Sequence, residues 1–163
     1  MKKLLLSLVL VATLVAFGAT QAEADDISVT VTITATLSVS VSPGTWAIGP
    51  IAEGAEPNTT LPDYFTATNG SNTTADLTIT IAGSDDWAFA NTPDADQFGM
   101  NFSTGGASPA WTLIDSLIGG SLANGLTAGS TQKFDLQLEA PTSTTVGGTP
   151  QTIVVTVTAS AAT

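Results

Sequence analysis

The chain of 163 residues has 14 carboxylates and neither histidine nor cysteine. These absences remove the usual general base, the thiol nucleophile, and the imidazole and thiolate metal ligands, and they exclude disulfides. The formal net charge of −11 disfavours nucleic acid and anionic lipid as partners.

Residues 1–24 have the features of a cleavable secretory signal peptide. Two lysines open the segment, an apolar run follows, and Ala22-Glu23-Ala24 fits the small-residue rule for cleavage. We expect the cut after Ala24, with a cut after Ala22 as the alternative. The mature chain then carries one lysine against 13 carboxylates, a side-chain charge of −12. We expect it to be secreted, as in bacterial export, and to act outside the cell or at the cell surface without inserting into a membrane.

A strictly alternating segment, residues 27–41, follows the leader. Its even positions are all serine or threonine, and its odd positions are Ile27, Val29, Val31, Ile33, Ala35, Leu37, Val39 and Val41. A period of two places every apolar side chain on one face of a strand. At about 3.3 Å per residue such a strand would reach roughly 50 Å, whereas common strands hold about 5–6 residues.

This long segment has two interpretations. It is either the first strand of a sandwich that switches sheets near Ala35, or an arm of which residues 26–35 pair with the next subunit by β-strand addition. Ala35 is the smallest apolar residue of the series and marks the break in both. We favour the arm, which divides the mature chain into a donor segment, 25–35, and a domain, 36–163.

The rest of the chain predicts a single antiparallel β-sandwich of eight or nine strands, jelly-roll-like or Ig-like. Turn signals recur every 8–12 residues, the spacing of sandwiches and barrels. The expected strands are 46–51, 61–68, 76–82, 87–90, 98–102, 110–114, 134–139 and 153–159, with one helical turn allowed within 114–122. In 134–139 the apolar residues alternate with a polar, charged row that we expect to face solvent.

Four loop carboxylates are the candidates for a metal site: Asp85, Asp86, Asp94 and Asp96. Clustered carboxylates suit a hard cation such as Ca²⁺. The spacing does not fit an EF-hand, and solvated carboxylates that end strands are the alternative interpretation. We therefore expect no certain cofactor, with Ca²⁺ as the ion to test.

A serine–lysine pair and three tryptophans are the other residues that suggest catalysis or ligand binding. Ser130 and Lys133 match the serine–lysine spacing of penicillin-binding enzymes, but that chemistry needs a helical turn and companion segments that this chain lacks. We therefore expect no enzymatic activity. The tryptophans Trp46, Trp87 and Trp111 would suit stacking on sugar rings, yet each has an apolar residue two positions later, as core residues do, and we expect two of the three in the core.

Four asparagines begin N-x-[ST] sequons: Asn58, Asn69, Asn72 and Asn101. Such sequons mark N-glycosylation acceptors in secreted proteins. In a chain so rich in serine and threonine, chance alone produces matches of this kind, and the bacterial character of the leader further disfavours glycans.

Three stretches give a resemblance to a known family: ISVTVTITATLSVSVSPGTWAIG directly behind the leader, YFTATNGSNTTADLTITI, and LTAGSTQKFDLQLEAP with GGTPQTIVVTVTAS. They resemble secreted β-sandwich fibre subunits of the TasA/camelysin type and, more loosely, donor-strand pilins. The resemblance includes a strand–Asn-Gly–strand hairpin. It implies a sandwich that lacks one strand, completed by the N-terminal segment of a neighbouring subunit.

The sequence leads to two hypotheses about function. The first is a structural subunit of an extracellular filament or biofilm matrix fibre, a homopolymer whose partners are copies of itself. The donor side chains would be Ile27, Val29, Val31, Ile33 and Ala35, and the acceptor groove would be formed by Ile153, Val155 and Val157. The alternative is a monomeric secreted binding module for carbohydrate or Ca²⁺, in which deletion of residues 25–35 would unfold the domain.

Overall fold

The computed structural model describes residues 30–32, 34–59, 64–106 and 109–163. The chain divides into two compact units, Met1–Ile33 and Thr34–Thr163, and the fold described below is that of the second. The signal peptide and the donor positions Ile27, Val29 and Ile33 lie outside the described residues, so those assignments stay predictions.

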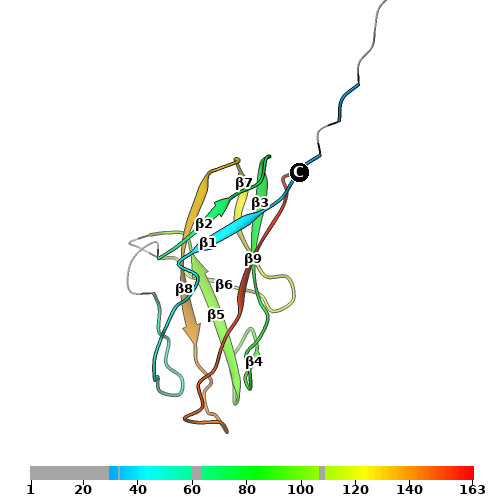
Figure 1. Cartoon of the computed structure of the whole chain (residues 1–163). Helices are drawn as coiled ribbons and strands as arrows, with labels where there is room; N and C mark the ends of the chain where they lie inside the picture. The colour runs from blue at the N-terminus through cyan, green and yellow to red at the C-terminus, as the bar shows by residue number, and fades with distance from the viewer. Residues whose placement is uncertain (1–29, 33, 60–63, 107–108) are drawn as a thin grey trace, which may run out of the picture. The chain divides into compact units, whose positions relative to one another are not determined.

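The second unit is all-β, as predicted, with nine strands in two sheets among its described residues (Figure 1). The larger sheet has the order β1 (Val39–Ser42), β2 (Phe65–Asn69), β8 (Thr131–Glu139), β5 (Gln97–Ser103) and β4 (Ala88–Phe89), with β6 (Thr112–Leu113) also paired to β5. The smaller sheet has the order β7 (Gly120–Leu126), β3 (Ala75–Ile81) and β9 (Val155–Ala161). All pairs are antiparallel except β4 with β5. In the described part of the chain, no helix is long and apolar enough to cross a membrane.

The core lies between the inward faces of the two sheets. In β3, Ala75, Leu77 and Ile79 are fully buried, while Thr78 and Thr80 are exposed, as a period of two dictates. Across the sandwich these residues meet the buried side chains of β5 and β8, which are Phe98, Met100, Phe102, Phe134, Leu136 and Leu138. Each large apolar side chain buried in this way contributes about 1.5–3 kcal/mol.

β8 departs from the expected alternation at Asp135, which is only 3 % exposed. Residues 55–59 run alongside the second half of β8, and Thr59 N–H donates to the Leu136 carbonyl at 3.0 Å. The Thr59 hydroxyl and the Tyr64 N–H both donate to Asp135 Oδ1 at 2.9 Å. The prediction that this row faces solvent was therefore wrong at Asp135, because residues that precede β2 cover the strand there.

The Asn-Gly pair ends β2 as expected, but no hairpin follows. β2 and β3 lie in different sheets, so residues 70–74 carry the chain from one sheet to the other. Asn69 is fully buried at this crossover: its Nδ2 donates to the carbonyls of Thr73 (3.1 Å) and Leu126 (2.8 Å), and its Oδ1 accepts the Ser71 N–H at 2.9 Å. The hairpin implied by the resemblance was therefore wrong, and Asn69 anchors a crossover.

Replacing Asn69 by alanine is expected to lower the free energy of unfolding by about 3 kcal/mol. The change removes three hydrogen bonds, and each buried group left without a partner costs about 1–3 kcal/mol. The matched control is Asn124→Ala, since Asn124 also precedes a glycine but is exposed on β7; its effect should stay within about 0.5 kcal/mol. Urea denaturation measures both, and equal effects of the two changes would contradict the anchoring role.

Candidate functional site

β9 is an outer strand with a free side. It pairs with β3 along all seven of its residues without a register shift, and no strand of the described part of the chain pairs with its other side. Just before β9, Ala82 N–H donates to the Val154 carbonyl at 3.0 Å, so the even-numbered residues of β9 are those that bond to β3. The backbone N–H and C=O groups that point to the free side belong to Val155, Val157, Ala159 and Ala161.

Of these residues, Val155, Val157 and Ala159 turn their side chains toward the core, and Ala161 is exposed. Val155 and Val157, with Ile153 before them, pack against the core but stay half-buried. Leu77 and Ile79 on the neighbouring strand β3 are fully buried. The core is therefore closed beneath β3 and incompletely covered along β9. The three positions that the sequence analysis assigned to an acceptor groove form one row at this margin.

β1 has the same organisation at the edge of the larger sheet. Gly70 N–H donates to the Ser38 carbonyl at 3.0 Å, so the even-numbered residues bond to β2. Val39 and Val41 therefore direct their backbone groups outward while their half-buried side chains pack against the core. β1 and β9 are neighbours in space (Figure 1). We call the boundary between them the β1–β9 seam, and a free edge of each sheet borders it.

The other edge of the smaller sheet, β7, is irregular. Its pairing with β3 shifts register between Ala75 and Leu77 and again between Leu77 and Thr78. Gly125 has a left-handed backbone, with φ of 63°, and its N–H donates to Asp76 Oδ1 at 2.7 Å. Such interruptions blunt an edge against the addition of another strand. Of the two edges of this sheet, β9 is thus the regular one.

On the donor side, the described positions of the alternating segment are exposed before β1 begins. Val31 is 76 % exposed and Leu37 is 41 % exposed. Ala35 is exposed as well, and Val39 is the first residue of the segment that packs against the core. Within the second unit, the apolar side chains that precede β1, Ala35 and Leu37, are therefore exposed.

Asp96 holds the loop that leads toward β9. Its carboxylate accepts the Thr145 N–H at 2.8 Å and the hydroxyls of Thr145 (2.8 Å) and Thr144 (3.0 Å). The backbone hydrogen bond from Thr145, and then the hydroxyl bonds, lower the pKa of Asp96 from its ordinary value. Asp96 also has a left-handed backbone, with φ of 51°, a conformation that aspartate tolerates better than most residues.

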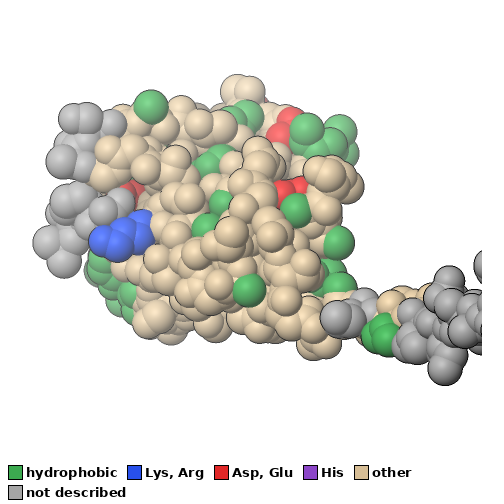
Figure 2. All heavy atoms as spheres, turned by 90° about the horizontal axis from the view of Figure 1, so that it is seen from above, with side chains coloured by type: hydrophobic (Ala, Val, Ile, Leu, Met, Phe, Trp, Pro, Cys, Tyr) green, Lys and Arg blue, Asp and Glu red, His purple; other side chains and the backbone are tan. Residues whose placement is uncertain are grey.

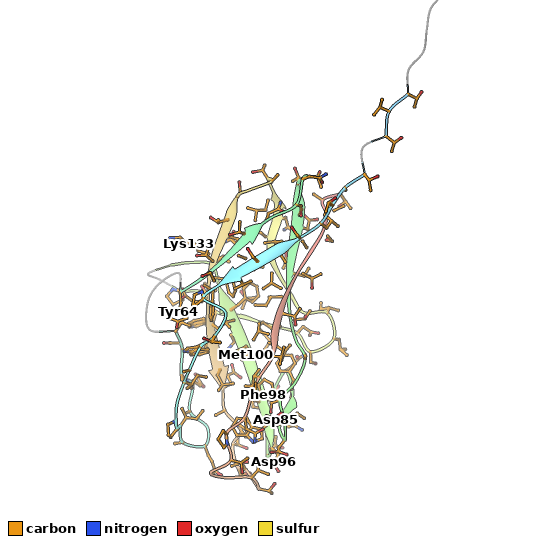
Figure 3. All side chains as sticks on the ribbon, in the orientation of Figure 1. Tyr64, Asp85, Asp96, Phe98, Met100 and Lys133 are labelled. Carbon is orange, nitrogen blue, oxygen red and sulfur yellow. The ribbon has the colours of Figure 1, made fainter. Side chains whose placement is uncertain are left out.

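The other three predicted ligands bind the same loop at separate points. Asp85 Oδ2 accepts the Thr152 N–H at 3.2 Å, and Asp86 Oδ2 accepts Gln151 Nε2 at 3.0 Å. Asp94 Oδ1 accepts the Thr142 hydroxyl at 3.3 Å. Figure 3 shows Asp85 and Asp96 toward the end of the sandwich opposite the end of β9. Among the described residues, no three metal-ligating side chains converge on one point. Ca²⁺ binding therefore stays a prediction, and the observed contacts of these carboxylates are with the loop.

Two of the tryptophans, Trp46 and Trp87, pack against the core, which agrees with the expectation for two of the three. Trp111 is half-buried. Trp87 Nε1 donates to the Thr144 hydroxyl at 3.1 Å. A cavity of about 40 Å³ lies beside Trp87, lined also by Glu53, Thr144 and the apolar residues Ile51, Ala52, Ala140 and Pro141. That volume holds one or two water molecules, and a sugar ring does not fit in it.

The sequon asparagines divide by exposure. Asn69 and Asn101 are buried and their amides are hydrogen-bonded within the domain, so the folded domain presents neither to a glycosylating enzyme. Asn58 and Asn72 are exposed. Ser130, of the serine–lysine pair, precedes β8 and its hydroxyl lies 2.6 Å from that of Thr127.

No protein-family model, curated protein or solved structure matches the chain. The resemblance to fibre subunits stays a prediction from the sequence. The features of the domain that bear most directly on function are the β1–β9 seam and the segment that precedes β1.

The contacts of Asp96 predict an acid-sensitive loop. Because the pKa of Asp96 is lowered in the folded chain, its contribution to loop stability is present above the ordinary aspartate value of 3.8 and is lost as the pH falls through the lower folded value. The amide NMR signal of Thr145 should therefore stay constant from pH 7 to about pH 4 and shift below it. In Asp96→Asn this acid step should vanish, whereas Asp94→Asn, which leaves the Thr145 contacts intact, should keep it. A step that survives in Asp96→Asn would contradict the assignment.

Proposed function

We propose that the chain is an exported structural subunit that polymerises into an extracellular filament or matrix fibre. Each copy donates residues 26–35 to the β1–β9 seam of the next copy. The observation that carries the proposal is the free side of β9, where outward backbone groups and half-buried, inward side chains belong to the same residues. A regular edge of this kind accepts an added strand through main-chain hydrogen bonds, while alternate side chains fill the space beneath it.

The donor matches this edge in period. In an antiparallel pair, residues directly opposite each other place their side chains on the same face. A donor that bonds through its odd positions therefore turns Ile27, Val29, Val31 and Ile33 toward the core, and its serines and threonines outward. A slip of one residue would bury hydroxyl groups without partners, so the alternation selects one parity of register.

Burial of the donor side chains favours assembly. Full burial of a valine or isoleucine contributes about 1.5–3 kcal/mol, so four of them supply roughly 6–12 kcal/mol before the cost of ordering the donor is subtracted. The opposing term is repulsion between subunits of side-chain charge −12. Figure 2 looks onto the end of the domain where β9 ends and shows mostly uncharged surface, with few carboxylates. Salt should accelerate polymerisation by screening the remaining repulsion.

The donor role is tested by Val31→Asp in the mature chain, residues 25–163. An unpaired charge at an inward donor position should abolish polymers, and the monomer should stay folded because Val31 is exposed. The matched control is Thr32→Asp, which adds the same charge to the outward face and should still polymerise. Negative-stain electron microscopy and sedimentation measure the amount of polymer, and normal polymers of Val31→Asp would contradict the proposal.

The acceptor role is tested by Ala159→Pro. The Ala159 N–H points to the free side of β9, so proline there leaves the bonds to β3 intact and removes only a donor of the free edge. We expect a folded monomer, with an unchanged urea midpoint, that donates but does not accept. Because Val31→Asp accepts but does not donate, a mixture of the two should give one-to-one dimers and no fibres. Fibres of Ala159→Pro alone would contradict the assignment of the edge.

Imaging of the unaltered mature chain, with and without millimolar Ca²⁺, separates the proposal from the monomeric binding module. Regular fibres with a repeat of one domain support the structural subunit, and fibres only with Ca²⁺ would add an ionic requirement. Monodisperse monomers in both conditions, together with unfolding on deletion of residues 25–35, would favour the binding module.

A further inference from the structure

Residues 34–38, which join the donor to β1, are held by a side chain of the crossover between β2 and β3. Asn72 Oδ1 accepts the Thr36 N–H at 2.9 Å, and Asn72 Nδ2 donates to the Thr34 carbonyl at 3.3 Å. The backbone N–H of Asn72 donates to the Thr36 carbonyl at 3.2 Å. Asn72 thus bonds to alternate residues of an extended segment, as a neighbouring strand would.

Ser71 and Gly70 extend the same contact toward β1. The Ser38 N–H donates to Ser71 Oγ at 3.0 Å, and Ser71 Oγ donates to the Ser38 carbonyl at 3.2 Å. Gly70 passes close to Ser38: a Cβ there would lie 2.6 Å from Ser38 Oγ, so a larger residue would require the Ser38 hydroxyl to rotate away. Buried Asn69 fixes Ser71 in turn. We call Gly70, Ser71 and Asn72, together with the segment that they bind, the clamp.

The clamp restricts the direction that the donor strand takes from β1. The segment 34–38 lies at the end of the domain where β9 finishes, since Asn72 bonds to Thr34 and the nearby Thr74 carbonyl accepts the Ala162 N–H at 3.4 Å. From that end β1 runs back along the domain. A donor that entered the seam of its own domain would have to reverse direction just before β1.

We infer that the clamp is a positioning device that directs the donor into a second copy of the chain and denies it the seam of its own domain. A reversal within residues 34–38 is prevented, because five hydrogen bonds from Ser71 and Asn72 hold them extended. A reversal before Thr34 would take two or more residues for the turn, and the donor would lose Ile33 and its neighbours. This inference rests on the proposed function, because it assigns a direction to the same strand donation.

The test compares Asn72→Ala with the exposed-asparagine control Asn124→Ala in the mature chain. Asn72→Ala removes the two side-chain bonds that hold Thr34 and Thr36 and leaves the bonds to Ser38 in place. The chain can then reverse before Ser38, and the donor is expected to enter its own seam, because a tethered strand has an effective concentration in the millimolar range. We expect the polymer fraction of Asn72→Ala to fall about tenfold at micromolar protein and the control to be unchanged. The Asn72→Ala monomers should also fail to bind a synthetic peptide of residues 25–38, measured by fluorescence anisotropy.

A double variant distinguishes self-insertion from damage to the seam. Adding Val31→Asp to Asn72→Ala disables the tethered donor, so peptide binding should return to the level of Val31→Asp alone. Normal polymers of Asn72→Ala would contradict the positioning role of the clamp. A double variant that still fails to bind the peptide would contradict it as well. Failure of the unaltered chain to polymerise, combined with failure of Val31→Asp to bind the peptide, would instead reject strand donation itself.

Discussion

The unpaired edge of β9 is the constraint on which the rest of this structure depends. Backbone N–H and C=O groups must bond to a strand, a side chain or water, and the odd-numbered residues of β9 direct theirs away from β3. The side chains of Val155, Val157 and Ala159 border the core and remain half-buried. The core is therefore incompletely covered along this margin, and a strand added there would bury more of it.

Other described features close parts of the domain away from this margin. β7 is interrupted by bulges, and residues 55–59 bond to the part of the β8 edge that β2 does not pair. The loop before β9 is fastened by Asp85, Asp86, Asp94 and Asp96. These carboxylates act as hydrogen-bond acceptors for backbone and hydroxyl groups, a role that needs no ion. In the smaller sheet the β7 edge is therefore irregular and the β9 edge is regular, and the β9 edge borders the β1–β9 seam together with the edge of β1.

The sequence predicted the all-β class and most strands because a period of two is a local signal. β3 and β9 were placed within about two residues, and Ile153, Val155 and Val157 were recognised as one face. Periodicity does not say which strands pair, so the passage of the chain between sheets after Asn69 was missed. The burial of Asp135 was missed for the same reason, since it depends on a segment some 75 residues away in the chain. Ser71 and Asn72 gave no signal beyond a sequon, because side chains that bond to a distant backbone leave no periodic trace.

The charged side chains are unevenly distributed along the sequence. Neither the alternating segment 27–41 nor the C-terminal residues 153–163 contain a charged side chain, although the mature chain carries 13 carboxylates. In the proposed polymer, strand donation would bring two uncharged segments together, and the repulsion would arise between whole domains at longer range. Such repulsion is screened over about 10 Å at 0.1 M salt, whereas the main-chain bonds and apolar contacts of the seam are not. In the proposed polymer, the acidic surface would keep the edges of separate subunits from associating at random, and a donor of the correct period would be the favoured occupant of the β9 edge.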